Sequence, residues 1–545
     1  MRNAFICLLC FAGASSAQQS VTIRIDPGET LGPMKPVWGY FGYDEPNYTY
    51  TNNGRKLIGE LGALDAAPVY IRTHNLLTTG DATPALKWGS TNAYTEDATG
   101  RPIYDWTIVD RIFDTYLNAG AKPFVEIGFM PEALSSHPEP YKHDWPKTNI
   151  YTGWSYPPKD YQKWSELVYQ WAKHTAKKYG EREAESWYWE VWNEPDIGYW
   201  HGTPEEYDKL YDFTAAALKR ALPGARVGGP ASTGPAGKNA AEFLRQFLRH
   251  CDQGGSPLEF ITFHAKGSPE IVDGHVRMGL ARNLKDVEAG FEIVSEFPKF
   301  RDLTIILSES DPEGCAACSA KEHPQNAYRN GPLYASYTAE AASRILELAQ
   351  RHQANITGML TWAFEFEDQP YFAGLRTLAT NGINKPILNL FRMEGMVEGA
   401  RVKVESSGAL ALNDILSRGV RQNADVNAIA AKSGHSIALL AWHYHDDDIA
   451  GPDIPVTLIV KRAQDMPGRA LLEHYRVDDH HSNAYSEWKQ MGSPQDPSPD
   501  QYSKLQAAGQ LQLLDSPRWV SATADSFTIN FALPRESVSL IELRY

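Results

Sequence analysis

The sequence has fewer basic than acidic residues. It also lacks, after its N-terminal segment, the long apolar runs of membrane proteins and the paired histidines of zinc hydrolases. Its 52 Lys and Arg residues stand against 67 Asp and Glu, a formal net charge of −15, so it is a poor candidate for binding nucleic acid. After the N-terminal segment no apolar stretch is long enough to span a membrane, and we expect no membrane partner. No two histidines stand at i and i+4 in a plausible helix, and His480 and His481 adjoin in a loop. This pattern argues against a zinc hydrolase, and we expect neither a metal nor a cofactor.

Cysteine is scarce, with 5 in 545 residues, and two of them fall in the N-terminal segment. Cys315 and Cys318, in the sequence C-A-A-C, could close a small disulfide loop in an oxidising compartment. The same spacing suits a redox motif or half a zinc site, but neither a second C-x-x-C nor a thioredoxin-like context accompanies it. Cys251 is most simply a buried free thiol.

The N-terminal residues M-R-N-A-F-I-C-L-L-C-F-A-G-A-S-S-A combine one basic residue, a short apolar run and small residues ending at Ala17. This pattern is typical of a secretory signal peptide, residues 1–17, with cleavage after Ala17. We therefore expect a secreted or periplasmic protein.

Between residues 36 and 398, short β-rich apolar runs alternate with segments of helical periodicity. In Lys159–Tyr179 apolar residues recur at spacings of three and four, and Asp105–Leu117 and Gly331–Arg351 behave similarly. Apolar strands alternating with helices predict a parallel sheet, and eight such units predict a (β/α)8 TIM barrel. A doubly wound open sheet is the alternative, weakened because no glycine-rich phosphate loop follows any strand. The eight runs are Pro36–Tyr43, Pro68–Thr73, Pro123–Phe129, Ser186–Trp192, Ala225–Gly229, Leu258–His264, Leu303–Ser308 and Ile356–Phe364.

From residue 399 to 545 the sequence pattern changes to strand-like runs joined by turn-rich connections. This pattern predicts a β-sandwich domain. We expect residues 18–35, which include the strand-like Val21–Ile25, to complete it, so the fold class is α/β with an additional β-sandwich. The runs are Ser436–His443, Pro455–Val460, Ala470–Val477, Ser526–Phe531 and Ser537–Leu543.

Polar residues follow several of the predicted barrel strands, at the end where barrel enzymes place their chemistry. Solvated loop ends often carry charge, so the informative feature is that these residues converge on one rim. They are Arg72 and His74 in I-R-T-H, Asn193 and Glu194 in W-N-E-P-D, His264 and Lys266 in F-H-A-K, Glu309 in L-S-E-S-D, and Trp362 and Asp368 in W-A-F-E-F-E-D.

Glu194 and Glu309 are the strongest candidate pair among these residues. Cleavage of a glycosidic bond needs an acid for the leaving oxygen and a carboxylate on the other face of the sugar. Glu194 emerges from the aromatic run W-Y-W-E-V-W, which would desolvate it, and Asn193 beside it can hydrogen-bond a sugar hydroxyl. Glu309 could lie near Arg72, a cation that would keep it ionised. The alternative is a pair of strand-end carboxylates held in salt bridges.

These segments resemble glycoside hydrolase family 39 over nearly the whole chain that follows the predicted signal peptide. W-Y-W-E-V-W-N-E-P-D is similar to the acid/base segment of the family, and S-E-S-D to its nucleophile segment. V-Y-I-R-T-H-N, K-P-F-V-E-I-G-F-M-P and H-S-N-A-Y-S-E-W-K-Q-M-G-S-P are similar as well. The resemblance implies that Glu194 is the acid/base, that Glu309 is the nucleophile, and that the mechanism is retaining. Glu190 is then a structural residue of its strand.

The family contains β-xylosidases and α-L-iduronidases, whose sugars differ at C5, where the iduronide carries a carboxylate. A uronide site needs cations, ideally an arginine. Lys266 and Arg376 match the carboxylate-binding positions of iduronidases, and Asp368 matches a sugar-contacting aspartate. The structural alternatives are a salt bridge for Lys266 and a loop-fixing pair between Arg376 and Asp368.

Other segments, R-T-H-N-L-L-T-T-G-D and H-S-N-A-Y, resemble exported bacterial β-xylosidases instead. We therefore predict an exo-acting β-xylosidase of xylo-oligosaccharides or related glycosides. A uronidase, or an arabino- or galacto-glycosidase, of the same family is the alternative. A carbohydrate-binding protein that has lost catalysis is the alternative from another class.

The remaining assignments concern side chains that could bind the sugar or could be buried structural residues. His264 is expected to hydrogen-bond the sugar or to steady Glu309, and His74 to contact the sugar. Trp362 or Trp192 is expected to floor the site. The expected partner is an oligosaccharide or glycoside, and the sequence does not indicate an oligomeric state.

Overall fold

The computed structural model describes residues 20–64, 67–142, 151–463 and 465–545. The predicted signal peptide, residues 1–17, lies outside these ranges. Within them, no helix has the length and apolar character that a membrane span requires.

Eight parallel strands form the first of two large sheets, and their order in the sheet is their order in the chain. The edges meet where Phe41 bridges Thr361, with Gly42 N donating to Thr361 O at 3.0 Å. The sheet is therefore a closed barrel, and all eight predicted strands are confirmed. The strands are β2 (Tyr40–Tyr43), β3 (Tyr70–Thr73), β6 (Lys122–Ile127), β7 (Tyr188–Val191), β8 (Arg226–Ser232), β9 (Phe260–Lys266), β12 (Thr304–Asp311) and β13 (Ile356–Met359).

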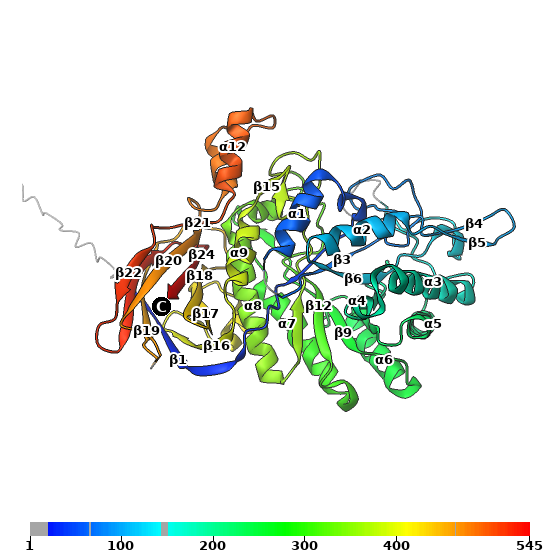
Figure 1. The fold of residues 1–545 in the computed structure, drawn as a ribbon, viewed down its shortest axis with the longest axis horizontal. Helices are drawn as coiled ribbons and strands as arrows, with labels where there is room; N and C mark the ends of the chain where they lie inside the picture. The colour runs from blue at the N-terminus through cyan, green and yellow to red at the C-terminus, as the bar shows by residue number, and fades with distance from the viewer. Residues whose placement is uncertain (1–19, 65–66, 143–150, 464) are drawn as a thin grey trace, which may run out of the picture.

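Helices surround this barrel (Figure 1). The predicted amphipathic segment 159–179 forms α3, which begins where the Asp160 carboxylate accepts from the backbone N–H groups of Gln162 and Lys163. Its face with Trp164, Leu167, Val168 and Trp171 is buried against the barrel. The helices of the ring are α1 (Asn52–Gly62), α2 (Thr107–Asn118), α3 (Tyr161–Tyr179), α4 (Glu181–Glu185), α5 (Pro204–Ala221), α6 (Lys238–Gly254), α7 (Leu280–Ser295), α8 (Pro332–His352) and α9 (Pro386–Gly395).

Loops at the barrel ends carry short elements. One of these loops holds a disulfide between Cys315 and Cys318, and Cys251 in α6 is a buried free thiol. The hairpins are β4 (Tyr94–Glu96) with β5 (Pro102–Tyr104), β10 (Glu270–Val272) with β11 (His275–Arg277), and β14 (Ala379–Thr380) with β15 (Ile383–Asn384). Short 3-10 segments lie at Pro46–Tyr48, Glu132–Leu134, Pro298–Phe300 and Pro324–Asn330.

The second sheet has ten strands, in the order β21-β20-β24-β18-β17-β16-β1-β19-β23, with β22 pairing β20. It forms the predicted second β-rich part of the chain. Hydrogen bonds join its strands into one curled sheet, whose opposite ends share a core that includes Leu472, Ile541 and Phe527. The strands are β1 (Val21–Pro33), β16 (Ala400–Ser406), β17 (Asp425–Ser433), β18 (Ser436–Tyr444), β19 (Ile454–Lys461), β20 (Arg469–Val477), β21 (Gln512–Leu513), β22 (Arg518–Ser521), β23 (Ser526–Leu533) and β24 (Ser537–Arg544).

The strand β1 lies inside this sheet rather than at its edge. It pairs with β16 in antiparallel orientation and with β19 in parallel orientation. The expectation that a strand near residues 21–25 joins the second sheet is therefore confirmed. Three helices belong to the same part of the chain: α10 (Leu412–Arg418), α11 (Ala484–Gln490) and α12 (Pro499–Ala508).

The second sheet packs against α8 of the barrel (Figure 1). At this junction Arg344 on α8 contacts Glu340 at 2.7 Å and Asp425 of β17 at 2.9 Å. Its guanidinium also donates to the carbonyl oxygen of Leu410 at 3.0 Å. A buried cation therefore ties the barrel to the second sheet.

Candidate active site

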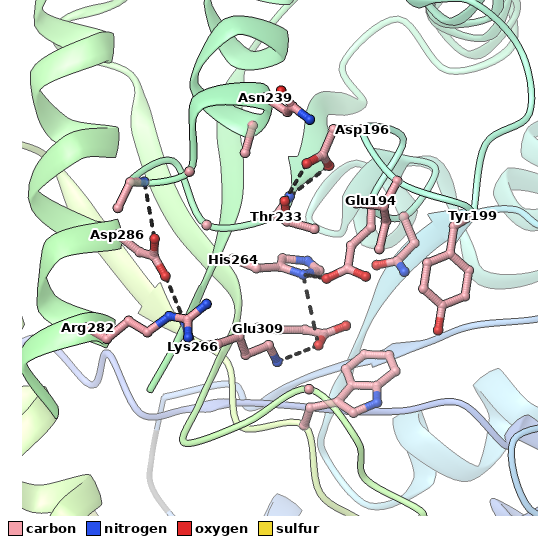
Figure 2. Close-up of a pocket in the computed structure, with 18 of the residues that line it drawn as sticks. Glu194, Asp196, Tyr199, Thr233, Asn239, His264, Lys266, Arg282, Asp286 and Glu309 are labelled. Atoms are coloured by element: carbon pink, nitrogen blue, oxygen red, sulfur yellow. Dashed lines mark hydrogen bonds and ion pairs between the residues drawn. The ribbon is translucent and has the colours of Figure 1, made fainter. Parts of the chain in front are cut away.

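A cavity of about 780 Å³ opens at the carboxyl ends of β7, β8, β9 and β12. Glu194 and Glu309 both line it, and in Figure 2 their carboxylates point toward one another across it. The convergence expected from the strand-end residues is therefore present. The predicted residues that line it are His74, Asn193, Glu194, His264, Lys266, Glu309 and Trp362.

Glu194 leaves β7 through a strained turn. Trp192 and Glu194 have φ angles of 73° and 44°, in the left-handed region that non-glycine residues seldom adopt. The N–H of Glu194 donates to Ala231 O at 2.9 Å, which fixes the turn to the end of β8. Trp192 itself is fully buried and packs edge-on against Trp200, so it belongs to the core and does not floor the cavity.

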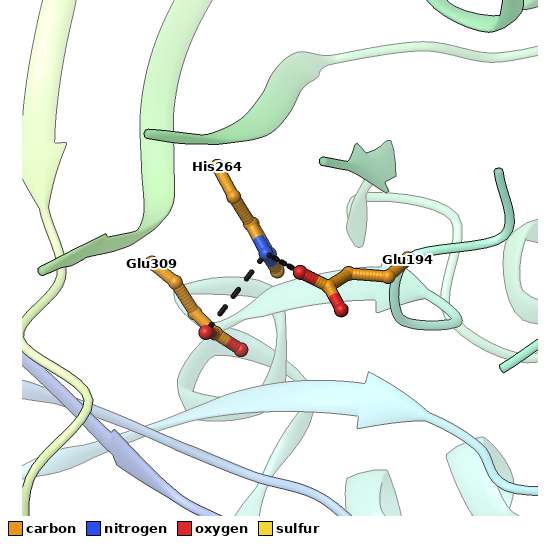
Figure 3. A group of neighbouring side chains, drawn as sticks. All are labelled: Glu194, His264 and Glu309. Atoms are coloured by element: carbon orange, nitrogen blue, oxygen red, sulfur yellow. Dashed lines mark hydrogen bonds and ion pairs between the residues drawn. The ribbon is translucent and has the colours of Figure 1, made fainter. Parts of the chain in front are cut away.

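Glu309 lies within β12, opposite His264 on β9. A register shift between Leu307 and Glu309 interrupts the ladder there, an irregularity of the kind that re-aims side chains. His264 Nδ1 lies 2.9 Å from Glu194 Oε1 and 3.9 Å from Glu309 Oε2 (Figure 3). One oxygen of each glutamate and one His264 nitrogen all lie within 4.8 Å of one another.

Positive charges surround Glu309. Lys266 Nζ lies 2.7 Å from its Oε2, and Arg72 Nη1 lies 3.4 Å from its Oε1. Burial would raise the pKa of Glu309, but Lys266, His264, Arg72 and His74 together bring it well below its usual range. The carboxyl is therefore ionised at neutral pH.

Arg72 lies beneath Glu309 and is fully buried. It contacts Glu190 at 2.6 Å and Glu126 at 3.2 Å, and it donates to Asn193 Oδ1 at 3.0 Å. Arg72 therefore supports the cavity from below without lining it, and Glu190 pairs with it inside the barrel.

His74 belongs to a buried network with two residues that sequence reasoning missed, Asp44 and Lys87. Asp44 lies 2.8 Å from His74 Nδ1 and 2.6 Å from Lys87 Nζ, and it accepts from Trp362 Nε1 at 3.2 Å. Burial lowers the pKa of His74, but the carboxylates of Glu126 and Asp44 raise it to about 9. Asp44 directly follows the first predicted strand, so the strand-end rule, which assigns polar residues at the carboxyl ends of barrel strands to the site, could have found it. Lys87 lies in a loop without such a pattern.

Trp362 fits against the barrel wall because residue 42 is a glycine. A Cβ at Gly42 would lie 2.5 Å from the Trp362 ring and 2.9 Å from Arg72 O. The ring packs beside His74, with centroids 4.2 Å apart. The face of this indole therefore reaches the cavity only because the neighbouring strand has no side chain there.

Asp368 and Arg376 are not brought to this cavity. Asp368 lines a separate cavity with Asn52 and Gln369. Arg376 is fully buried, donates to Trp362 O at 2.7 Å and pairs with Glu313 at 2.9 Å. Its partner is thus Glu313 rather than Asp368, and Arg376 is not among the residues that line the cavity.

Glu194, His264 and Glu309 are residue types that also bind metals. The charge around them does not suit a divalent cation, because Lys266 and Arg72 already contact Glu309. The set is better suited to proton transfer and nucleophilic attack.

A protein-family model described as glycosyl hydrolases family 39 matches residues 21–525. The chain belongs to glycosyl hydrolase family 39. A β-xylosidase from Geobacillus stearothermophilus is 27% identical over 496 residues, covering 87% of this family 39 hydrolase and 86% of the relative. An α-L-iduronidase from Mus musculus is 24% identical over 593 residues, covering 99% and 83%.

The fold of this hydrolase is also that of a solved β-xylosidase. The crystal structure of a monomeric β-xylosidase from Caulobacter crescentus CB15 superposes with a TM-score of 0.76 at 24% identity. The match covers 96% of this chain and 99% of the other. It shows that the barrel and the curled sheet occur together in another protein.

Proposed function

We propose that this protein is a secreted, retaining exo-β-xylosidase that removes terminal xylose from xylo-oligosaccharides or related glycosides. The observation that carries the proposal is the carboxylate pair Glu194 and Glu309, whose oxygens face one cavity within 4.8 Å of each other. Retaining glycosidases hold their two carboxyl groups about 5–5.5 Å apart, whereas inverting enzymes need about 6.5–9.5 Å for a water. The short separation supports a retaining mechanism.

In the first step Glu309 attacks C1 of the sugar while Glu194 gives its proton to the glycosidic oxygen. The C1–O bond breaks, an ester forms between C1 and Glu309, and the leaving sugar departs with the proton. In the second step Glu194, now ionised, takes a proton from water. That water attacks C1 and releases Glu309.

The surroundings of the two glutamates support these different roles. Glu309 is held ionised by Lys266 and Arg72, as a nucleophile requires. Glu194 is 15% exposed at the cavity and contacts only the imidazole of His264 among these charged groups. His264 is suited to orient the Glu194 carboxyl toward the leaving oxygen, and at 3.9 Å from Glu309 Oε2 it also helps to lower the pKa of Glu309, in line with the expectation that it steadies that residue.

Xylose is favoured over a uronide because the expected carboxylate-binding cations are already engaged. Lys266 pairs with Glu309 and Asp311, and Arg376 is buried against Glu313. A uronide carboxylate would have to displace these contacts. The likeness to proteins named β-xylosidases supports the same choice, while the likeness to α-L-iduronidases keeps uronides as the second candidate.

The test compares wild type with Glu194→Gln and Glu309→Gln on a nitrophenyl β-xyloside. Each change should lower kcat by about 10²–10⁴-fold or more, with circular dichroism as a control for folding. Azide should rescue Glu309→Gly and release a xylosyl azide of inverted configuration. Normal hydrolysis by the Glu309 variant would refute the assignment of the nucleophile.

Two further measurements separate the alternatives. Faster hydrolysis of an iduronide or glucuronide than of the xyloside, lost in Lys266→Ala, would favour a uronidase. Tight xylose binding without turnover of any glycoside would favour a protein that only binds carbohydrate.

Export is proposed from the N-terminal pattern of residues 1–17. N-terminal sequencing of the protein recovered from outside the cytoplasm should begin at Gln18. A recovered chain that still begins at Met1 would contradict this cleavage.

A further inference from the structure

One wall of the cavity, formed by the starts of α6 and α7, carries three exposed basic side chains. Lys238 begins α6, and Arg282 and Lys285 lie in the first two turns of α7; all three line the cavity. The ion pairs found in the described parts of the chain engage Lys87 and Lys266 of the same cavity but none of these three. The wall is therefore positively charged on a protein whose net charge is −15.

Two acidic residues of the same cavity, Asp286 and Asp196, accept hydrogen bonds, and while burial raises the pKa of Asp286, the charge of Arg282 acts to lower it. Asp286 is buried, and its carboxylate accepts from the backbone N–H groups of Ala236 at 3.1 Å and Lys266 at 3.2 Å. Asp196 accepts from the N–H of Thr233 at 2.9 Å and from its hydroxyl. These bonds tie the loop after β8 to α7 and to the segment that carries Glu194, so the wall is a fixed part of the site.

The position of the wall assigns it to the leaving group. The reacting sugar lies against Glu309, and Glu194 must reach the glycosidic oxygen, so the leaving group extends past Glu194. In Figure 2 Thr233, Asn239 and Asp196 lie on the far side of Glu194 from Glu309, whereas Arg282 lies beside Lys266 and Asp286. The cavity of about 780 Å³ has room for more than one sugar ring.

From this arrangement we infer that the leaving-group side selects an acidic sugar, bearing a uronate carboxylate or a sulfate ester. The inference rests on the proposed function and extends it. Arg282 offers the planar fork that pairs with a carboxylate or sulfate through two hydrogen bonds, and Lys238 and Lys285 add positive charge to the same cavity. The substrate class is then a terminal xylose linked to an anionic sugar.

The basic wall continues outward, which gives an acidic chain room to extend. Arg282 and Lys285 also line a neighbouring cavity of about 420 Å³, together with Arg277 and Arg418. In that cavity Arg277 and Arg418 each pair with an aspartate. Arg282 and Lys285 of α7 are thus exposed cations that line both cavities.

The test uses three xylosyl disaccharides that differ only at C6 of the leaving sugar: xylosyl-glucose, xylosyl-glucuronate and xylosyl-glucose 6-sulfate. An exposed charge pair contributes about 0.2–1 kcal/mol, and 1.4 kcal/mol is a factor of ten. Three such pairs contribute about 0.6–3 kcal/mol, so wild type should cleave an anionic disaccharide with a kcat/KM about 3–140-fold above that of the neutral one. The larger of the two anionic values identifies the anion, and the advantage should shrink in high salt.

Substitution should remove this advantage. The ratio of anionic to neutral kcat/KM should fall about 2–5-fold in Lys238→Ala, Arg282→Ala and Lys285→Ala, and to about one in the triple variant. Arg249→Ala, an exposed cation near the other end of α6, is the matched control and should keep the wild-type ratio.

The outcomes separate this inference from the proposed function. A protein that cleaves nitrophenyl xyloside but shows no preference for either anionic disaccharide overturns the inference alone. A preference that survives in the triple variant overturns it as well. A protein that cleaves no xyloside overturns the proposed function and the inference with it.

Discussion

The ion pair between Lys266 and Glu309 determines how activity should depend on pH. Burial would raise the pKa of Glu309, and Lys266 is the foremost of the charges that lower it. Methionine in place of Lys266 keeps a long side chain and removes the charge. The nucleophile should then become protonated at a higher pH than in wild type.

The size of this effect follows from the geometry. At the 2.7 Å between Lys266 Nζ and Glu309 Oε2, two unit charges attract by roughly 6 kcal/mol at an effective dielectric constant of about 20. A single opposite charge usually changes a carboxyl pKa by about 1–3. Because Arg72 at 3.4 Å and His74 at 3.8 Å remain, we expect the pKa of Glu309 to rise by about 1–2.

The assay is kcat/KM for a nitrophenyl xyloside between about pH 3 and 8, which reports groups of the free enzyme. Activity should be lost as the pH falls through the pKa of Glu309, below the usual carboxyl range in wild type and higher in Lys266→Met. Ionised Glu309 contributes stability that is present above its unfolded pKa and is lost as the pH falls through its lowered folded pKa. Because this lowering is smaller in Lys266→Met, the variant should lose less stability on acidification than wild type. Lys266→Arg, which keeps the charge, is the control.

Two results would refute this reasoning. One is an acid limb that superposes for wild type and Lys266→Met while both proteins are folded. The other is an equal displacement of the limb in Lys266→Arg, because the charge would then not be its cause.

Three further substitutions test other contacts of the structure. Gly42→Ala should push against the Trp362 ring and cost about 1–3 kcal/mol of stability together with activity; Gly59→Ala, on the open face of α1, should cost neither, and equal Tm values for the two would contradict the close fit. Arg344→Met leaves two buried carboxylates without a cation and should lower the free energy of unfolding in urea by about 3–5 kcal/mol; an unchanged midpoint would contradict it. His264→Ala removes the 2.9 Å bond to the acid/base and should lower kcat about 10–100-fold without unfolding, so a loss below about twofold would count against it.

The barrel could be predicted because each of its strands can be recognised from its local sequence pattern. Apolar runs such as Leu303–Ser308 and helices such as Lys159–Tyr179 have clear periods, and their alternation leaves few arrangements. The pairing of β1 with β16 and β19 could not be predicted in this way. Local pattern shows that a segment is a strand, but not which distant strand will be its neighbour.

The site could be predicted as far as the strand-end rule reaches. The rule found Glu194, His264, Lys266 and Glu309, because the ends of parallel strands must meet at one rim. Arg376 was assigned from the resemblance instead, and it lies buried beyond β13 in a loop whose path no pattern describes. The charged wall on α6 and α7 was missed for the same reason, since a helix start bears on the cavity only through the fold.

Trp192 illustrates the limit at the level of a single residue. Its neighbours Asn193 and Glu194 line the cavity, and an aromatic ring next to them looks like a sugar platform. The left-handed backbone at Trp192 turns its ring into the core instead. A single φ angle thus determines whether a side chain points into the cavity or into the core.

The interior place of β1 in the second sheet, between β16 and β19, has a consequence for how the protein is made. Residues 21–33 leave the ribosome well before their partners at 400–406 and 454–461. At about 5–20 residues per second, the interval before the first partner exists is roughly 20–75 s. Throughout that time β1 is a strand with both edges open, the kind of segment that recruits other chains. A chaperone that holds nascent chains extended would serve this strand first, and cutting β1 away should leave a gap between β16 and β19 that no other described strand fills.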